Sequence, residues 1–294
     1  MKYPKKPTFQ KHKLTDSPIY EVSVRILALT KDCSEVYASG TGVVLAQNLI
    51  LTAKHVFEDF ASRWNVIDDN GTLSAESFNI WVVFISSDPR ELYHVYEVAN
   101  VYINPYSDMV LFHLSAFDKA GATQSWKQAK LSLTIPKVGE RVVAFGFAKS
   151  KVEVTKNAGG QSDIKVNDEP YVSVGEIIEV YPEKRDLYLL PFPSIRINAR
   201  LDGGMSGGPV FNDEGALIGI VCSSYDQDQQ EENISYVSLL WPLMATTLMD
   251  KNDKTYPLYD LAMRGILGVQ GLDNIVLTKA DREFLYNVSY KERT

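Results

Sequence analysis

One serine in the chain is surrounded by glycines. Ser206 lies in the stretch 201–210, which reads LDGGMSGGPV. Glycine permits backbone conformations that other residues avoid, so consecutive N–H groups can point toward one place. A hydroxyl beside such N–H groups supplies a nucleophile and hydrogen-bond donors for the oxyanion that forms in acyl transfer. A glycine-rich hairpin turn that contains a serine is the alternative, because both residues are common in turns.

A serine nucleophile needs a base, and the four histidines of the chain are the candidates. His55 closely follows the apolar segment 49–53, so it is expected at a strand end, where the scaffold is rigid and the ring reaches a cleft. His12 belongs to a polar terminal segment, and His94 and His113 lie within strand patterns that favour a structural role. His55 is therefore the predicted base, with an exposed loop histidine as the alternative.

The base in turn needs a group that orients it, and Asp108 is the candidate. It is a lone acid at the start of the apolar segment 109–112. A carboxylate there would be partly buried, which is costly without a partner, and an imidazole N–H is a suitable partner. A turn cap is the alternative, because aspartate is common in turns such as the one that the preceding Asn-Pro pair indicates. Asp68, Asp69 and Asp88 lie in polar surface turns and are weaker candidates.

Two other nucleophile arrangements fit less well. Gly204, Ser206 and Gly208 also match the Gly-x-Ser-x-Gly elbow of α/β-hydrolases. That elbow needs a helix and then a histidine after the serine, whereas a hairpin-like segment follows here and the last histidine is His113. Cys222 ends an apparent core strand, where a buried and unreactive thiol is the ordinary expectation.

The segments that carry these residues have the pattern of short β-strands separated by turns. Strands are expected at 20–29, 38–46, 48–52, 80–85, 93–103 and 109–114, and, after the polar segment 115–129, at 141–147, 171–180, 187–190, 194–197, 209–211 and 216–221. Many short strands at close spacing predict barrels or sandwiches, and two series around one linker predict two β-barrels. A helical turn is expected at 53–60, a helix at 238–249 and a mobile loop at 156–163.

This pattern divides the chain into four parts. Residues 1–18 are expected to form a flexible N-terminal arm, and residues 19–118 the first β-barrel. Residues 119–250 would contain a linker, the second β-barrel and the C-terminal helix. Residues 251–294 are a C-terminal extension of mixed pattern, and the pattern does not define its role.

Composition limits the classes of partner. The chain has 294 residues, 45% of them hydrophobic and 23% charged, with a net charge of -7. Because only the short segment 2–13 is locally basic, nucleic acid is not an expected partner. No apolar segment approaches the roughly 20 residues of a membrane span, and none follows the basic N-terminus as in a signal peptide. The two cysteines do not make a disulfide framework, so a cytoplasmic protein without metal or cofactor is expected.

Three separated segments resemble the trypsin-like (chymotrypsin-fold) serine proteases. Segment 52–55 (TAKH) resembles the family's Thr-Ala-x-His, 107–111 (SDMVL) its Asp-x-Ala-Leu-Leu type segment, and 204–210 (GMSGGPV) its Gly-x-Ser-Gly-Gly-Pro-[Leu/Val]. The order of histidine, aspartate and serine is that of the family, and 217–221 resembles the strand that lines its substrate pocket. The resemblance covers residues 20–250 and is most specific at the serine.

The resemblance implies an all-β fold of two antiparallel six-stranded β-barrels with a C-terminal helix and a mixed tail, and a serine endopeptidase acting on protein or peptide substrates. In that family's mechanism Ser206 would attack the scissile carbonyl, His55 would act as general base and then acid, and Asp108 would orient the imidazole. The N–H groups of Gly204 and Ser206 would form the oxyanion hole. The alternative function is a protease-fold binding or scaffold module with a latent or vestigial triad.

Two departures from the digestive branch resemble the non-zymogen, Deg-type bacterial branch. Met205 stands where the digestive enzymes have an aspartate that pairs with a newly cut N-terminus, so that activation route is not expected. Val56 follows His55, and the usual disulfides are absent. Deg proteases also carry a PDZ domain after the protease, for which 251–294 is too short.

The resemblance places a candidate substrate pocket. Arg200 would lie near its floor, and Cys222, Ser223 and Ser224 along its wall. An inward Arg200 would favour an acidic substrate residue before the cut. A surface arginine beside Asp202 is the alternative, because burying an unpaired guanidinium is costly.

Two segments are candidate regulators. The expected loop at 156–163 is one, and the extension at 251–294 is the other. We expect the extension to be the place where a regulatory partner or a second copy would bind.

Overall fold

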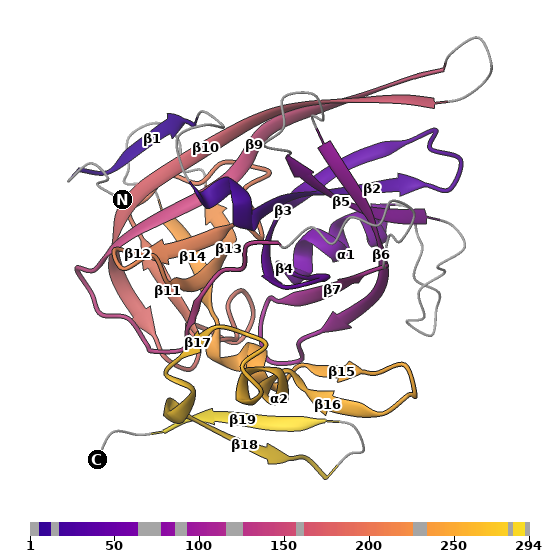
Figure 1. The fold of residues 1–294 in the computed structure, drawn as a ribbon. Helices are drawn as coiled ribbons and strands as arrows, with labels where there is room; N and C mark the ends of the chain where they lie inside the picture. The colour runs from indigo at the N-terminus through magenta and orange to yellow at the C-terminus, as the bar shows by residue number, and fades with distance from the viewer. Residues whose placement is uncertain are drawn as a thin grey trace.

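The computed structural model describes residues 6–12, 18–63, 78–85, 93–115, 126–156, 162–225, 234–281 and 285–291. Two β-barrels lie side by side, and the C-terminal residues form a smaller layer that lies below them in Figure 1. None of the described helices has the length and apolar character that crossing a membrane requires.

The first barrel has six antiparallel strands. They close in the order β2 (Ser23–Thr30), β3 (Val36–Ala46), β4 (Leu49–Thr52), β7 (Val110–Leu114), β6 (Tyr93–Ile103) and β5 (Phe78–Ile85). The apolar strand β4 is buried along its whole length. Helix α1 (Lys54–Arg63) follows it almost directly, which confirms the helical turn expected at 53–60.

The second barrel also has six antiparallel strands. They follow the order β9 (Arg141–Lys156), β10 (Ser162–Tyr181), β11 (Ser194–Ile197), β14 (Ile234–Leu239), β13 (Leu217–Tyr225) and β12 (Pro209–Asn212), and the pairing of β12 with β9 closes the barrel. The predicted all-β fold of two six-stranded barrels is confirmed. Two short parallel strands, β8 (Leu131–Ser132) and β17 (Val269–Gln270), extend the sheet beyond β13.

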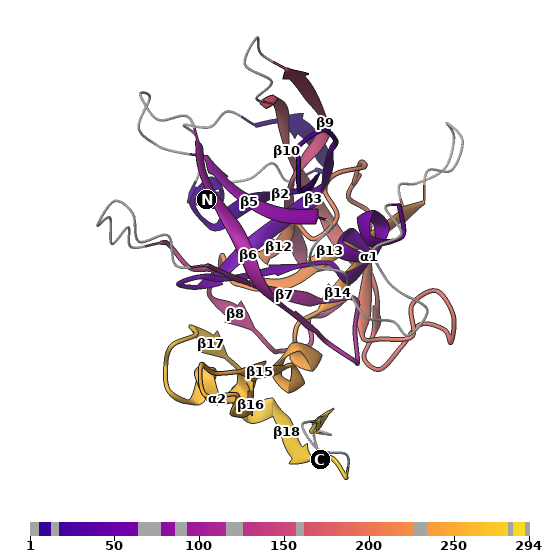
Figure 2. The ribbon, with the colours of Figure 1, turned by 90° about the vertical axis from the view of Figure 1, so that its right-hand side faces the viewer.

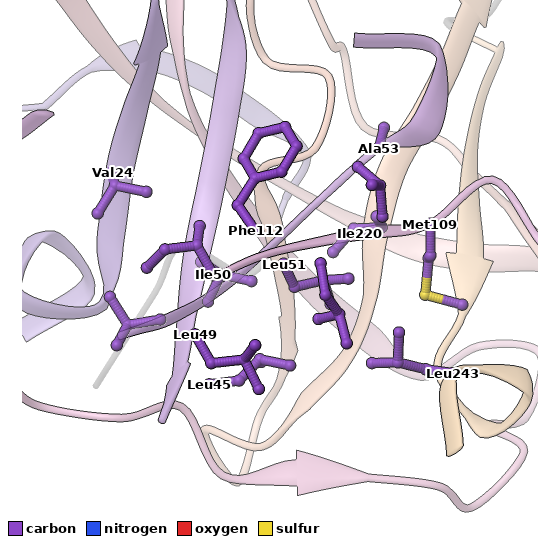
Figure 3. Close-up of a cluster of buried hydrophobic side chains, with 14 of the residues drawn as sticks. Val24, Leu45, Leu49, Ile50, Leu51, Ala53, Met109, Phe112, Ile220 and Leu243 are labelled. Atoms are coloured by element: carbon purple, nitrogen blue, oxygen red, sulfur yellow. The ribbon is translucent and has the colours of Figure 1, made fainter. Parts of the chain in front are cut away.

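Buried apolar side chains continue from one barrel into the other. Leu51 and Met109, from the first barrel, lie near Ile220 of β13 and near Leu243 (Figure 3). All four belong to one cluster of buried residues and are fully excluded from solvent. Because interiors are closely packed, this shared cluster fixes how the two barrels meet.

The helix expected at 238–249 is wrong for most of its length. Strand β14 continues to Leu239, a short 3-10 helix η2 (Trp241–Ala245) follows, and β15 (Thr247–Met249) ends the segment. Pro242 stands at the start of η2, where it suits a first helical turn. Pairing of β14 with both β11 and β13 commits the preceding residues to the sheet.

The strand expected at 187–190 is also wrong, because these residues form a loop between β10 and β11. The carboxylate of Asp186 accepts hydrogen bonds from the backbone N–H groups of Tyr188 (2.8 Å) and Leu189 (2.6 Å). Aspartate offers the backbone an alternative to a sheet ladder in this way. Leu187, Tyr188 and Leu189 therefore belong to an exposed loop rather than a strand, while Leu190 is buried.

The C-terminal extension folds against the barrels (Figure 2). Its elements are β16 (Thr255–Pro257), α2 (Leu258–Met263), β17, the 3-10 helix η3 (Leu272–Asn274), β18 (Ile275–Lys279) and β19 (Tyr286–Tyr290). Leu258, Leu267 and Ile275 are buried in the same cluster as the barrel residues. The extension is thus continuous with the protein core.

The expected N-terminal arm and the expected loop at 156–163 both include residues that form strands of the second barrel's sheet. Residues Thr8–Lys11 of the expected arm form β1, which pairs with β10, whereas 1–5 and 13–17 lie outside the described residues. The hairpin of β9 and β10 is long and reaches across the first barrel in Figure 1. Of the loop expected at 156–163, residues 157–161 lie outside the described part, whereas Lys156 ends β9 and Ser162 and Asp163 begin β10.

Candidate active site

His55 and Asp108 face each other at one end of the first barrel. His55 stands in the first turn of α1, just after β4, and Asp108 just before β7. Because Thr52 of β4 pairs with Val110 of β7, these neighbouring positions are brought together. The His55 Nδ1 and Asp108 Oδ2 atoms are 2.7 Å apart, and the backbone N–H of His55 donates to Oδ1 at 3.0 Å.

The environment of His55 sets its protonation. Burial of the ring would lower its pKa, because it disfavours the charged imidazolium. The hydrogen bond and negative charge of Asp108, aided by Asp59 and Glu58, outweigh this effect and raise the pKa of His55 above its ordinary value. Asp108 thus stabilises the charged form that a general base acquires when it takes a proton.

Ser206 lies in the loop between β11 and β12 and lines the same cleft as His55 and Asp108. This cleft has a volume of about 830 Å³. Within the described residues the Ser206 hydroxyl has no hydrogen-bond partner, so the bond to His55 that general-base catalysis needs is not made in this state. Such bonds often tighten only when substrate is bound.

The backbone of the serine loop depends on two glycines. Gly204 has a φ of +90° and Gly207 a φ of +78°. Residues that carry a side chain rarely adopt such backbone angles. A Cβ atom on Gly207 would also collide with the Thr52 hydroxyl and the Thr41 carbonyl. Gly204 and Gly207 are therefore required by the backbone conformation and, at Gly207, by the lack of space for a side chain.

The N–H groups of Gly204 and Ser206 stand on either side of an occupied one. Among the described residues, these two donate to no protein acceptor, whereas the N–H groups between and after them are occupied. Met205 donates to the Asp202 carbonyl at 3.1 Å, and Gly207 to the Val221 carbonyl at 2.8 Å. Free N–H groups beside a hydroxyl can receive the oxyanion of an acyl-transfer intermediate.

Thr41 of β3 connects the two barrels at the serine loop, and sequence reasoning missed it. Its N–H donates to the Ser206 carbonyl (2.9 Å) and its hydroxyl to the Gly204 carbonyl (2.8 Å). The same hydroxyl accepts from the Phe147 N–H at 3.0 Å. The Thr41 carbonyl accepts from the Thr52 hydroxyl at 2.7 Å, three residues before His55. The only local signal was a threonine between two glycines.

The family model for the trypsin-like peptidase domain matches residues 40–220, more than half of the chain. The chain belongs to the trypsin-like peptidase family. This family consists of peptidases, which are hydrolases of proteins, and the two-barrel chymotrypsin-like fold agrees with it. No curated protein matches the chain.

Solved protease structures are similar to this trypsin-like peptidase at low identity. The active form of the Rv3671c protease from M. tuberculosis is 20% identical, with a TM-score of 0.45, over 81% of this chain and 87% of that chain. The MamO protease domain from Magnetospirillum magneticum is 14% identical, with a TM-score of 0.46, over 76% and 93%. Deg5 is 15% identical, with a TM-score of 0.48, over 75% and 84%.

Met205, which stands where digestive trypsin-like peptidases have an aspartate, is packed into the interior of the second barrel. The side chain is fully buried in the apolar cluster of the second barrel. Gly146 of β9 approaches it so closely that a Cβ atom there would lie 2.6 Å from the Met205 Cα. The position next to Ser206 is therefore filled by packed apolar atoms.

Arg200 lies on the surface of this peptidase. Its guanidinium donates two hydrogen bonds to Asp202, at 2.7 and 3.0 Å, and lies 4.8 Å above the ring of Phe9. Half of its side chain is exposed, and it does not line the cleft that contains Ser206. This geometry fits the surface alternative rather than a pocket floor.

The other expected pocket residues belong to β13. Cys222 is buried, is not in a disulfide and lines the cleft. Ser223 and Ser224 continue the strand, and their side chains lie outside what the structure describes. Among the described residues, no group of three or more histidine, cysteine, aspartate or glutamate side chains is placed to hold a metal ion.

Proposed function

We propose that the protein is a serine endopeptidase that hydrolyses peptide bonds of protein or peptide substrates through an acyl-enzyme. The observation that carries this proposal is the 2.7 Å pair of His55 and Asp108 in the same cleft as Ser206. Membership of the trypsin-like peptidase family supports it.

In the proposed mechanism, the Ser206 hydroxyl attacks the scissile carbonyl and His55 takes its proton. Because Nδ1 of His55 is bound to Asp108, Nε2 is the atom that exchanges protons with the serine and the leaving amine. The N–H groups of Gly204 and Ser206 stabilise the oxyanion. The amine then leaves with the proton from His55, and water, activated by the same base, releases the acyl group from Ser206.

A protease-fold scaffold with a latent triad remains the second candidate. The observation that favours it is the missing hydrogen bond between Ser206 and His55. A scaffold needs no such bond, whereas a peptidase must form it on binding substrate.

A fluorophosphonate probe separates the two candidates, because it reacts only with an activated serine. We expect wild-type protein to be labelled and the Ser206→Ala variant, with unchanged circular dichroism, to stay unlabelled. A folded wild-type protein that resists the probe even in the presence of peptide substrate would leave the scaffold as the better account.

Compartment and regulation belong to the proposal as well. Cys33 and Cys222 are not joined in a disulfide, which supports a cytoplasmic, reducing environment. A regulatory partner or a second copy bound through residues 251–294 stays a prediction.

A further inference from the structure

The two walls of the cleft differ in chemistry. The wall from the first barrel carries the four charged or titratable residues Lys54, His55, Glu58 and Asp108, together with Pro105, Tyr106 and Ser107. Apart from Ser206, the wall from the second barrel is largely apolar, and its members are Tyr188, Leu189, Leu190, Pro191, Phe192 and Cys222. A polypeptide lying in this cleft would therefore meet most of the apolar surface on the side of the second barrel.

Three consecutive apolar residues project from the apolar wall into solvent. Leu187 is 67% exposed, Tyr188 91% and Leu189 61%. Tyr188 and Leu189 also line the cleft that contains Ser206. Apolar side chains gathered on a surface in this way commonly mark a binding site.

The loop that carries them has a defined conformation. One oxygen of Asp186 accepts three backbone N–H groups, those of Tyr188 (2.8 Å), Leu189 (2.6 Å) and Leu190 (3.4 Å). These bonds lower the pKa of Asp186 to about 2, so its carboxylate stays charged and keeps them at any ordinary pH. The Arg185 guanidinium donates to its other oxygen at 2.9 Å.

The base of the loop is anchored in the protein. Leu190 and Phe192 are buried in one cluster with Cys222 and Tyr236. The Arg185 guanidinium lies 4.7 Å above the Tyr236 ring. Leu187, Tyr188 and Leu189 are thus held in an exposed position by an anchored loop. A surface that is organised before binding loses less conformational entropy when a partner binds.

We propose that Leu187, Tyr188 and Leu189 form a docking surface for apolar side chains of the polypeptide substrate, beside the bond to be cut. The inference rests on the proposed function, and the occupant follows from continuity, because Tyr188 and Leu189 of this surface border the same cleft as Ser206 and Leu187 adjoins them in the chain. Preferred substrates then carry apolar side chains close to the bond that is cut.

The test measures binding to the full-length Ser206→Ala variant, so that it does not depend on turnover. The probes are two acetylated octapeptides of equal length and charge, one with leucine and phenylalanine and the other with serine and asparagine at the same places. We expect at least tenfold tighter binding of the apolar peptide, measured by fluorescence polarisation. Adding Leu187→Ser and Tyr188→Ser should reduce that preference at least fivefold.

Matched controls are available elsewhere on the surface. Val138 and Met263 are each 63% exposed and do not line the cleft. Val138→Ser and Met263→Ser should leave the preference unchanged. Size-exclusion chromatography with light scattering is run on every variant.

Each contrary outcome overturns the inference. Absence of binding at millimolar apolar peptide, equal binding of the two peptides, or an unchanged preference in the double variant would do so. A change from dimer to monomer in that variant would assign the surface to a contact between copies. Failure of the proposed function is a separate result, because it is read from fluorophosphonate labelling of the wild-type serine.

Discussion

At the scale of single residues, the proposed chemistry depends on the protonation of His55. Only the neutral imidazole can accept the proton of Ser206, so activity is lost when the ring is protonated. Asp108 raises the pKa of His55 despite the opposing effect of burial. In the proposed mechanism, the pair of His55 and Asp108 would therefore set both the strength of the base and the lower end of the active pH range.

The proposed role of His55 predicts that kcat/KM increases with pH. Because the pKa of His55 is raised above its ordinary value of about 6.5, kcat/KM should rise with pH through a midpoint above that value. Asp108→Asn should lower kcat by a factor on the order of 10⁴, as replacement of the orienting carboxylate does in other serine proteases. Steady-state kinetics with a peptide substrate measures both. A wild-type midpoint well below 6.5 would contradict the role given to Asp108.

The pairing of His55 with Asp108 could be predicted from the sequence because the signals of both residues are local. The segment around His55 combines an apolar strand, its end and a polar turn, and Asp108 precedes another apolar strand. Pairing between the strands then brings the two together. Arg200 illustrates the limit of such reasoning, because whether it points inward or pairs with Asp202 depends on contacts that its position in the chain does not specify.

At the scale of elements, strand β3 positions the serine loop through Thr41. Thr41 and Gly204 are 163 positions apart in the chain, so no local sequence pattern predicts the hydrogen bond between them. The loop at 187–190 illustrates the same limit, because its apolar sequence favours a strand while Asp186 captures its N–H groups. Strand pairing likewise overrides the helical pattern at 238–239.

Replacing the Thr41 hydroxyl tests this positioning role. Thr41→Val keeps the shape but leaves the Gly204 carbonyl and the Phe147 N–H without their partner. Each buried group left unpaired costs about 1–3 kcal/mol, so the loop should relax and kcat should fall at least tenfold with little change in KM. Thr41→Ser keeps the hydroxyl and should restore most of kcat.

Strand β3 provides a control for this variant. The hydroxyl of Ser39 donates to the Ile26 carbonyl at 3.4 Å, within the first barrel. Ser39→Ala should therefore leave kcat nearly unchanged. Equal loss of kcat in the Ser39→Ala and Thr41→Val variants would indicate general damage to β3 instead of a specific link to the serine loop.

At the scale of the whole molecule, one buried cluster joins the first barrel, part of the second barrel and the extension. The two barrels were predictable, because their short strands fall into two series in the sequence. The packing of the extension was not, since Leu267 and Ile275 are buried while their apolar neighbours Ile266 and Val276 are exposed, and the mixed pattern does not distinguish them. Their burial depends on contacts with barrel residues that are far away in the chain.

The extension should contribute to global stability. Leu258 is fully buried, so Leu258→Ala should reduce the free energy of unfolding by about 2–5 kcal/mol, as loss of a packed side chain does. Met263→Ala, on the same helix but 63% exposed, should change it by no more than about 0.5 kcal/mol. Urea unfolding followed by fluorescence measures both. Equal and small effects would show that the extension is not coupled to the barrels.

The shared buried cluster also has a consequence for folding during translation. A chain leaves the ribosome N-terminus first, at about 5–20 residues per second. The residues proposed for catalysis are made before the extension, yet the buried cluster that includes first-barrel residues also contains Leu258, Leu267 and Ile275 of the extension. This core cannot be complete before residue 275 has been translated. We therefore expect the barrels to reach their full stability, and the proposed activity to begin, only after the extension has been made.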